Sequence, residues 1–161
     1  MLVVLAIMAI LSAIAAPSFK NLIQSSTISS NVNTFLADMR YARSESIKRG
    51  GGVVMCRSGA PEADNPECSS TGDWVDGWII FHDWNDNGTQ ENDEALLRVQ
   101  SPITSVDAIT ASVYKFDFTA TGRIPFQNGT LTFGGDDYAT DVKRCVVIST
   151  SGRARIADTC S

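Results

Sequence analysis

Two arginines near the end of the sequence have the spacing of a phosphate-binding pair. Residues 145–150 predict a strand, residues 151–152 a turn, and residues 153–156 a second strand that returns beside the first. Side chains two residues apart on a strand point to the same face, so Arg153 and Arg155 would present guanidinium groups ~7 Å apart. This spacing is comparable with that of neighbouring phosphates along a nucleic-acid strand, so the hairpin is a candidate polyanion site.

Further residues around this hairpin support the same hypothesis. Gly152 belongs to the turn, and Lys143 and Arg144 lie just before the first strand, where they would widen the basic surface. The alternative is structural, because an exposed arginine pair also balances acidic residues of the same chain or of a neighbouring subunit. We expect no recognition of base sequence from this pair.

A second group of residues matches the pattern of a calcium-binding loop. Residues 83–94 satisfy every fixed position of D-x-[DN]-x-[DN]-G-x5-E, with Gly88 at the sharp turn. The ligands would be Asp83, Asn85, Asn87, Thr89 and Glu94. Strands, not helices, are predicted on both sides, and Gln90 replaces the hydrophobic residue that usually follows the turn. Calcium is thus a candidate ligand and not a required cofactor, and the alternative is a solvated acidic loop.

The sequence offers little for catalysis. His82 is the only histidine, and it precedes Asp83 at the end of a predicted strand. Adjacent residues on a strand point to opposite faces, and neither a nucleophile elbow nor a glycine-rich phosphate loop is present. We therefore expect no catalytic residues and no enzyme activity.

Charge is divided unevenly along the chain. The net charge of the 161 residues is −5, and the ten acidic residues between positions 58 and 97 have no lysine or arginine among them. Basic residues gather in two other stretches: Arg40, Arg43, Lys48 and Arg49, and Lys143, Arg144, Arg153 and Arg155. Because the whole molecule repels a polyanion, binding of one must be local.

The four cysteines favour disulfides over a metal site. Four cysteines allow three pairings, and proximity in the sequence favours Cys56–Cys68 and Cys145–Cys160. A structural zinc site is disfavoured by the single histidine and by the lack of a Cys-x-x-Cys motif. Disulfides imply an oxidising compartment, such as the bacterial periplasm or the cell surface.

The first sixteen residues are apolar except for Ser12 and carry no charge, so they need lipid or a protein partner. As a helix they would rise ~24 Å, short of the ~20 residues that span a hydrocarbon core. A cleaved signal peptide is the alternative. It is disfavoured because no basic region precedes the run and because an amphipathic helix, kinked at Pro17, is predicted to follow.

The remaining elements predict a fold of the α+β class. Apolar residues recur at helical spacing up to about residue 49, and three glycines then end the helix. Lys48 and Arg49 suit the negative end of the helix dipole, although they are also candidates for a binding surface. Strands are predicted at residues 53–57, 74–81, 95–100, 113–119, 130–133 and 145–150, and Asn128-Gly129 predicts a two-residue hairpin turn. Short turns join antiparallel neighbours, so a long helix would cover one or two antiparallel sheets.

Several stretches resemble one protein family. Residues 2–19, Leu-Val-Val-Leu-Ala-Ile-Met-Ala-Ile-Leu-Ser-Ala-Ile-Ala-Ala-Pro-Ser-Phe, resemble the N-terminal helix of type IV pilins and pseudopilins. Arg43-Ser-Glu45, Gly77-Trp-Ile-Ile-Phe81 and Gly152-Arg-Ala-Arg155 are similar to motifs of the FimT and GspH subgroup of minor pilins. The last of these, Gly-Arg-x-Arg, lies between a Val-Val-Ile-Ser strand and a C-terminal cysteine, as it does in FimT-like proteins.

The resemblance implies a type IV pilin-like fold and a location. Residues 1–24 would be the transmembrane and filament-core half of the helix, and residues 25–161 a periplasmic head. The subunit would cross the bacterial inner membrane once and reach the pilus or cell surface after assembly with other pilins. Family members are made as precursors with a basic leader that prepilin peptidase cuts before a Phe-Thr-Leu-Ile-Glu motif, and they are then methylated. Since that motif does not precede residue 1, we expect the sequence to begin at an internal methionine.

The resemblance also implies a function. FimT-like minor pilins of naturally competent bacteria capture DNA through the Gly-Arg-x-Arg hairpin, without sequence specificity, during transformation. Two alternatives share the fold: a GspH-like minor pseudopilin of type II secretion, and a structural pilus subunit that does not bind DNA.

Overall fold

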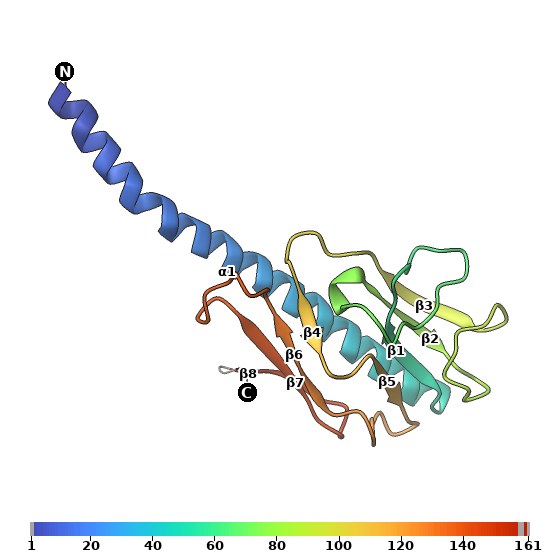
Figure 1. Cartoon of the computed structure of the whole chain (residues 1–161). Helices are drawn as coiled ribbons and strands as arrows, with labels where there is room; N and C mark the ends of the chain where they lie inside the picture. Colours follow the sequence, from blue (N-terminus) through green and yellow to red (C-terminus); the bar gives the residue numbers. More distant parts are fainter. Residues whose placement is uncertain (1, 158–159, 161) are drawn as a thin grey trace.

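The computed structural model describes residues 2–157 and 160, with side chains from residue 20 onward. One helix, α1 (Leu2–Arg49), is continuous through the predicted kink site at Pro17 and ends before the three glycines, as predicted. Its first half extends beyond the sheets, whereas its second half lies against them (Figure 1). The apolar run at residues 1–16, with its predicted membrane role, lies outside the described side chains. In the part of the chain whose side chains are described, no helix has an apolar stretch sufficient to cross a membrane.

Within the residues that the structure describes, eight strands form two antiparallel sheets of four strands each. The first sheet has the order β3-β2-β1-β5 and contains β1 (Val53–Arg57), β2 (Trp78–His82), β3 (Ala95–Gln100) and β5 (Lys115–Phe118). The second sheet has the order β4-β6-β7-β8 and contains β4 (Ile109–Ala111), β6 (Gly129–Phe133), β7 (Arg144–Ile148) and β8 (Ala154–Ala157). The fold is therefore the predicted α+β type, a long N-terminal helix packed on antiparallel sheets (Figure 1).

The core is shared by the helix and both sheets. The predicted apolar stripe of α1 is buried, and Phe35 lies at its centre. The Phe35 ring makes edge-on contacts with Trp74, Trp78 and Phe133 at centroid distances of 5.5 to 5.9 Å. Aromatic rings of this size bury large apolar areas, so this cluster fixes both sheets to the same helix.

The central strands of the first sheet, β1 and β2, are buried on both faces, which explains their continuous apolar sequences, whereas the edge strand β3 is largely exposed. Met55 and Ile80 face the helix, whereas Val54, Ile79 and Phe81 form a smaller cluster on the outer face. Cys68 packs against that outer cluster and forms the predicted disulfide with Cys56. The disulfide therefore holds the acidic segment at residues 58–72 over the sheet. The second predicted disulfide, Cys145–Cys160, is also present.

A polar contact that no local sequence pattern predicts also joins the helix to the first sheet. Asp38 is 3 % exposed and accepts a hydrogen bond of 2.8 Å from Trp78 Nε1. Its other carboxylate oxygen pairs with Arg98 of β3, whose guanidinium lies 4.2 Å from the centre of the Tyr41 ring. A buried carboxylate is tolerated only when its partners satisfy it, so these four side chains act as one unit.

The predicted strand at residues 74–81 is confirmed only from Trp78 onward, and its first part is wrong. Trp74–Asp76 is a short 3-10 helix, η1, and β2 begins only at Trp78. The Asp73 side chain caps η1 by accepting a hydrogen bond from Trp74 N, and Gly77, at φ 105°, is the C-cap residue that ends it. The Trp74 Nε1 donor reaches the Val113 carbonyl at 2.9 Å. Tertiary contacts of this ring override the strand propensity of its neighbours.

Two further strand predictions need correction. Asn128-Gly129 does not form a hairpin, because β5 pairs with β1 and β6 pairs with β4 and β7, so the segment between them connects the two sheets. The strand β4 was not predicted. It has only three residues, too few for an alternating pattern to be visible in the sequence.

Candidate functional site

The C-terminal hairpin is present, but its second strand, β8, begins at Ala154, so Arg155 lies on the strand whereas Arg153 lies just before it. β7 and β8 are antiparallel, with Val147 opposite Arg155 and Ile148 opposite Ala154. Arg153 and Arg155 are both exposed, and both line the same surface cleft. The two arginine side chains therefore lie on the same side of the molecule.

The turn of this hairpin requires a glycine at position 152. Gly152 has φ 72°, which residues with a side chain rarely adopt, and its N–H donates to the Ser149 carbonyl at 2.9 Å. Ser149 in turn donates its N–H to the Arg153 carbonyl at 3.0 Å and its hydroxyl to the same oxygen at 3.2 Å. These bonds fix the backbone that carries Arg153.

A second loop holds the hairpin turn against the helix. A Cβ atom at Gly152 would overlap the carbonyl oxygen of Gly122, and Ile124 N donates to the Thr150 carbonyl at 3.1 Å. A Cβ atom at Gly122 would in turn lie 2.8 Å from Cγ of Arg43 in α1. The hairpin turn therefore packs against the loop at Gly122, and this loop packs against α1. A side chain at either glycine would force these elements apart.

The cleft has a volume of about 450 Å³ and lies between the helix and the hairpin. Its lining residues are Met39, Arg40, Arg43, Val147, Ser149, Gly152, Arg153, Ala154 and Arg155. Four of these nine are arginines, two from α1 and two from the hairpin. The sequence shows the charge of both stretches but not their proximity, because no local pattern indicates that residues more than 100 positions apart are adjacent.

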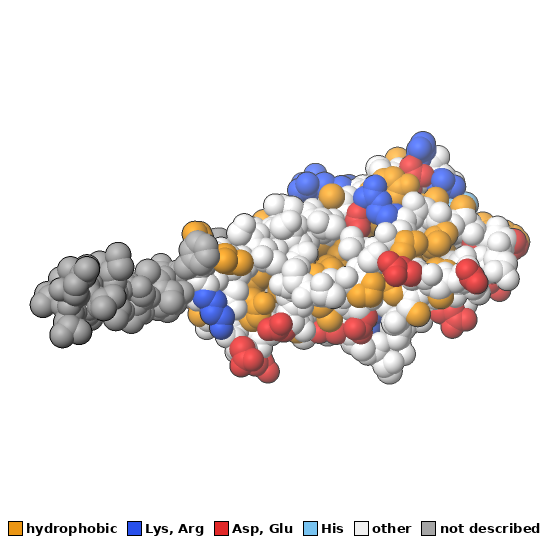
Figure 2. Space-filling view, turned by 90° about the horizontal axis from the view of Figure 1, so that it is seen from above, with side chains coloured by type: hydrophobic (Ala, Val, Ile, Leu, Met, Phe, Trp, Pro, Cys, Tyr) orange, Lys and Arg blue, Asp and Glu red, His pale blue; other side chains and the backbone are white. Residues whose placement is uncertain are grey.

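Within the described part of the chain, none of these four arginines forms an ion pair. The ion pairs there are Lys48–Glu45, Arg49–Glu45, Arg98–Asp38 and Lys115–Asp117. Lys48 and Arg49 thus bond Glu45, and their hydrogen bonds lower the pKa of that carboxyl. Figure 2 shows most basic side chains of that face along one edge of the head, with some acidic side chains beside them and others on the rest of the face.

Lys143 and Arg144 lie at the opposite end of β7 from the turn and do not line the cleft. Arg144 Nη1 donates to the carbonyl oxygens of Asp141 at 2.7 Å and Lys143 at 2.9 Å. This guanidinium is therefore used in part to hold the turn before β7.

The predicted calcium loop is folded by its own hydrogen bonds. The Asp83 carboxylate accepts Asn87 N at 3.1 Å and Gly88 N at 2.7 Å, and the Asn87 side chain accepts Thr89 N at 2.8 Å. The Asn85 side chain also accepts Asn87 N, at 3.0 Å. Among the residues with described side chains, no group of three or more acidic, histidine or cysteine residues is placed to hold a metal ion, so calcium binding has no support here.

Glu94, the last predicted calcium ligand, faces back into this loop. Its two oxygens accept Trp84 N at 3.1 Å and Glu91 N at 3.3 Å, and the residue is 5 % exposed. Burial raises the pKa of this carboxyl, and the nearby Asp83 and Glu91 charges add to the rise. The residue therefore closes the loop by accepting backbone donors.

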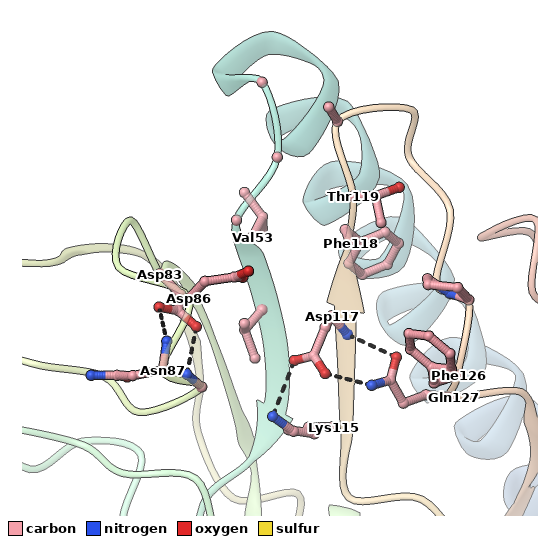
Figure 3. Close-up of a pocket in the computed structure, with 17 residues that line it drawn as sticks. Val53, Asp83, Asp86, Asn87, Lys115, Asp117, Phe118, Thr119, Phe126 and Gln127 are labelled. Atoms are coloured by element: carbon pink, nitrogen blue, oxygen red, sulfur yellow. Dashed lines mark hydrogen bonds and ion pairs between the residues drawn. The ribbon is translucent and has the colours of Figure 1, made fainter.

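A second cavity, of about 480 Å³, lies between the end of α1, this loop and β5 (Figure 3). Among its described lining residues Lys115 is the single cation, and it pairs with Asp117 at 3.3 Å. Gln127 accepts a hydrogen bond from Asp117 N at 3.3 Å and donates one to the Asp117 carboxylate (Figure 3). With its cation neutralised and Asp83 and Asp86 also in the lining, this cavity does not suit an anion.

Comparisons with known proteins agree with this fold. The model of the family "Type II transport protein GspH" matches residues 31–152. Two crystal structures of the type IV minor pilin FimU of Pseudomonas aeruginosa (strain PAO1) have the same fold. The first has a TM-score of 0.60 and 22 % identity, covering 81 % of this chain and 87 % of FimU. The second has a TM-score of 0.56 and 25 % identity, covering 80 % and 91 %.

No curated protein sequence matches significantly. The family and the fold are those of structural, non-enzymatic pilus or pseudopilus subunits. Because the family model covers well over half of the sequence and the pilin fold agrees with it, this chain belongs to the GspH family and is a minor pilin of the FimT/GspH type.

Proposed function

We propose that this minor pilin binds DNA through its Gly-Arg-x-Arg hairpin and thereby supports DNA uptake in natural transformation as well as pilus biogenesis. The observation that carries the proposal is the state of Arg153 and Arg155. They are exposed, they line one cleft, and neither has an ion-paired carboxylate among the described residues. Arginines left without a counterion on a rigid hairpin suit a polyanionic partner.

The proposal includes a place for the protein in the cell. Residues 1–24 would anchor the subunit in the inner membrane and then enter the filament core, and residues 25–161 would form the periplasmic head. Other pilins would be its neighbours, as the family suggests, and prepilin peptidase would act on the full-length precursor, followed by methylation. The two disulfides support an oxidising location outside the cytoplasm.

Binding should be weak and dependent on salt. Few phosphates can be neutralised by one cleft, so we expect a Kd of roughly micromolar or weaker. The described residues that line the cleft include no aromatic ring on which a base could stack, so sequence preference should be slight. Lys143 and Arg144 would add long-range attraction but less direct contact, because they lie outside the cleft.

The test is a DNA titration of the full chain in nonionic detergent, comparing wild type with the Arg153→Ala/Arg155→Ala double variant. Losing two phosphate contacts should weaken binding about 5.5-fold per contact at 0.15 M salt, or about 30-fold in total. The Lys20→Ala variant is the control, because it removes a charge from α1 far from the hairpin. A wild type that does not bind DNA, or a double variant that binds as well as wild type, would contradict the proposal.

The second candidate is a GspH-like minor pseudopilin of type II secretion, and the description of the matching family favours it. In that case protein export, and not transformation, would depend on the subunit. Deleting the gene and measuring both secretion and transformation separates the two functions. A loss of secretion with unchanged transformation would select the pseudopilin.

A further inference from the structure

We propose that Arg40 and Arg43 of α1 are phosphate-binding residues that form, with Arg153 and Arg155, the two walls of one groove for a nucleic-acid backbone. This inference rests on the proposed DNA binding and extends it from a hairpin to a two-sided site. The sequence motif covers one wall only.

The placement of the helix pair is the first argument. Arg40 and Arg43 are three residues apart on α1, so they share one face of the helix. That face meets β7 and β8, and both side chains line the 450 Å³ cleft together with the hairpin arginines. The four cations thus converge from two elements on one space.

The lack of counterions is the second argument. Helix arginines are commonly neutralised by an acidic residue three or four positions away, but positions 36, 37, 39, 44, 46 and 47 are all uncharged. The structure gives neither Arg40 nor Arg43 an ion pair with a described carboxylate from any other element. Four like charges in one cleft repel one another, and a bound polyanion would relieve this repulsion.

The contact through Gly122 is the third argument. The stem of Arg43 lies against Gly122, and the carbonyl of Gly122 lies against Gly152 of the hairpin. Both walls are therefore positioned by the same loop before any ligand binds. A preorganised pair of walls loses less conformational freedom on binding than independent side chains do.

The chemistry of the groove identifies its ligand as the sugar-phosphate backbone. Met39, Val147 and Ala154 supply an apolar lining between the arginines, and the described lining residues include no acidic side chain. Guanidinium groups on two sides bind phosphate oxygens in bidentate fashion without contacting base edges. We therefore expect binding of oligonucleotides of any sequence.

The salt dependence of binding tests the inference. The probe is a fluorescent mixed-sequence DNA oligonucleotide titrated into the full chain in nonionic detergent at several salt concentrations. Replacing both helix arginines, Arg40→Ala/Arg43→Ala, should reduce the slope of log K against log salt by about 1.8 and weaken binding about 30-fold at 0.15 M salt. The variant Arg40→Lys/Arg43→Lys should retain most of the slope, because a lysine still neutralises a phosphate.

A matched control separates local contact from net charge. Lys20→Ala removes a cation from the same helix ~30 Å away, and it should leave the slope unchanged. If the helix double variant keeps the wild-type slope while Arg153→Ala/Arg155→Ala loses about 1.8, the groove is one-sided and the inference is wrong, although the proposed function stands. If no variant changes the slope, the proposed function itself fails.

Discussion

The arginines of the two halves of the molecule have opposite environments. In the half formed by the first sheet, Arg98 pairs with the buried Asp38, and Arg57 Nε donates to the Ser69 carbonyl at 2.9 Å. In the cleft beside the second sheet, the arginines have no such carboxylate among the described residues. This chain therefore uses arginine in one half to stabilise the packing of helix on sheet, whereas the cleft arginines of the other half are available for the proposed DNA contacts.

Removing the buried Asp38 carboxylate should have the largest effect on stability. Asp38→Ala leaves Trp78 Nε1 without its acceptor and Arg98 without its counterion, which should cost about 3–5 kcal/mol of unfolding free energy. Chemical denaturation measures this change. Asp64→Ala is the matched control, because Asp64 is exposed and its loss should change stability by less than about 0.5 kcal/mol. Equal stability of the two variants would show that the Asp38 contacts are not structural.

Substituting the glycine of the hairpin turn should have the next largest effect on stability. Gly152→Ala places a methyl group against the Gly122 carbonyl and strains a backbone at φ 72°, so we expect a loss of about 1–3 kcal/mol. Gly59→Ala is the control, because nothing lies within 4 Å of its added Cβ. A thermal or denaturant midpoint of Gly152→Ala equal to that of the control would refute the close contact. DNA binding by the folded Gly152→Ala protein should also weaken, because the turn positions Arg153.

The hairpin motif and the fold class can be predicted from the sequence, but the cleft cannot. The helix stripe, most strands and both disulfides follow from short-range periodicity and proximity, and the structure confirms them. The second wall at Arg40 and Arg43 depends on how α1 crosses β8, which only the tertiary fold determines. The calcium-loop pattern is the opposite case, because here a complete local match did not predict the structure's use of the residues. In the loop at residues 83–94 the carboxylate oxygens accept hydrogen bonds from the backbone N–H groups of the same loop.

The same substitution in the two halves should affect different properties. Arg98→Ala removes an ion pair and the contact with the Tyr41 ring, and should lower the unfolding free energy by about 2 kcal/mol. Arg153→Ala/Arg155→Ala removes exposed side chains without ion pairs and should change stability by less than about 0.5 kcal/mol while DNA affinity falls. Denaturation and DNA titration of both variants give the full comparison. A large stability loss in the hairpin variant would indicate a structural role for its arginines.

The smallest expected effect is a change in the pH dependence of stability, and it distinguishes Glu94 of the acidic loop from Glu45 beside the helix end. Burial raises the pKa of Glu94 above its ordinary value of 4.5, so the folded protein holds this proton more tightly than the unfolded chain. The resulting stabilisation is present below pH 4.5 and is lost as the pH rises through the folded-state pKa. Hydrogen bonds from Lys48 and Arg49 lower the pKa of Glu45, so its contribution is present above pH 4.5 and is lost as the pH falls.

The two windows therefore lie on opposite sides of pH 4.5, and urea denaturation across that range separates them. Compared with wild type, Glu94→Gln should lose less stability as the pH rises just above 4.5, because an amide does not ionise. Glu45→Gln should not change the stability profile just above pH 4.5, but it should reduce the loss of unfolding free energy as the pH falls below 4.5. If Glu94→Gln instead follows the wild-type curve above pH 4.5, burial does not raise the pKa of the Glu94 carboxyl, and the loop does not enclose this side chain.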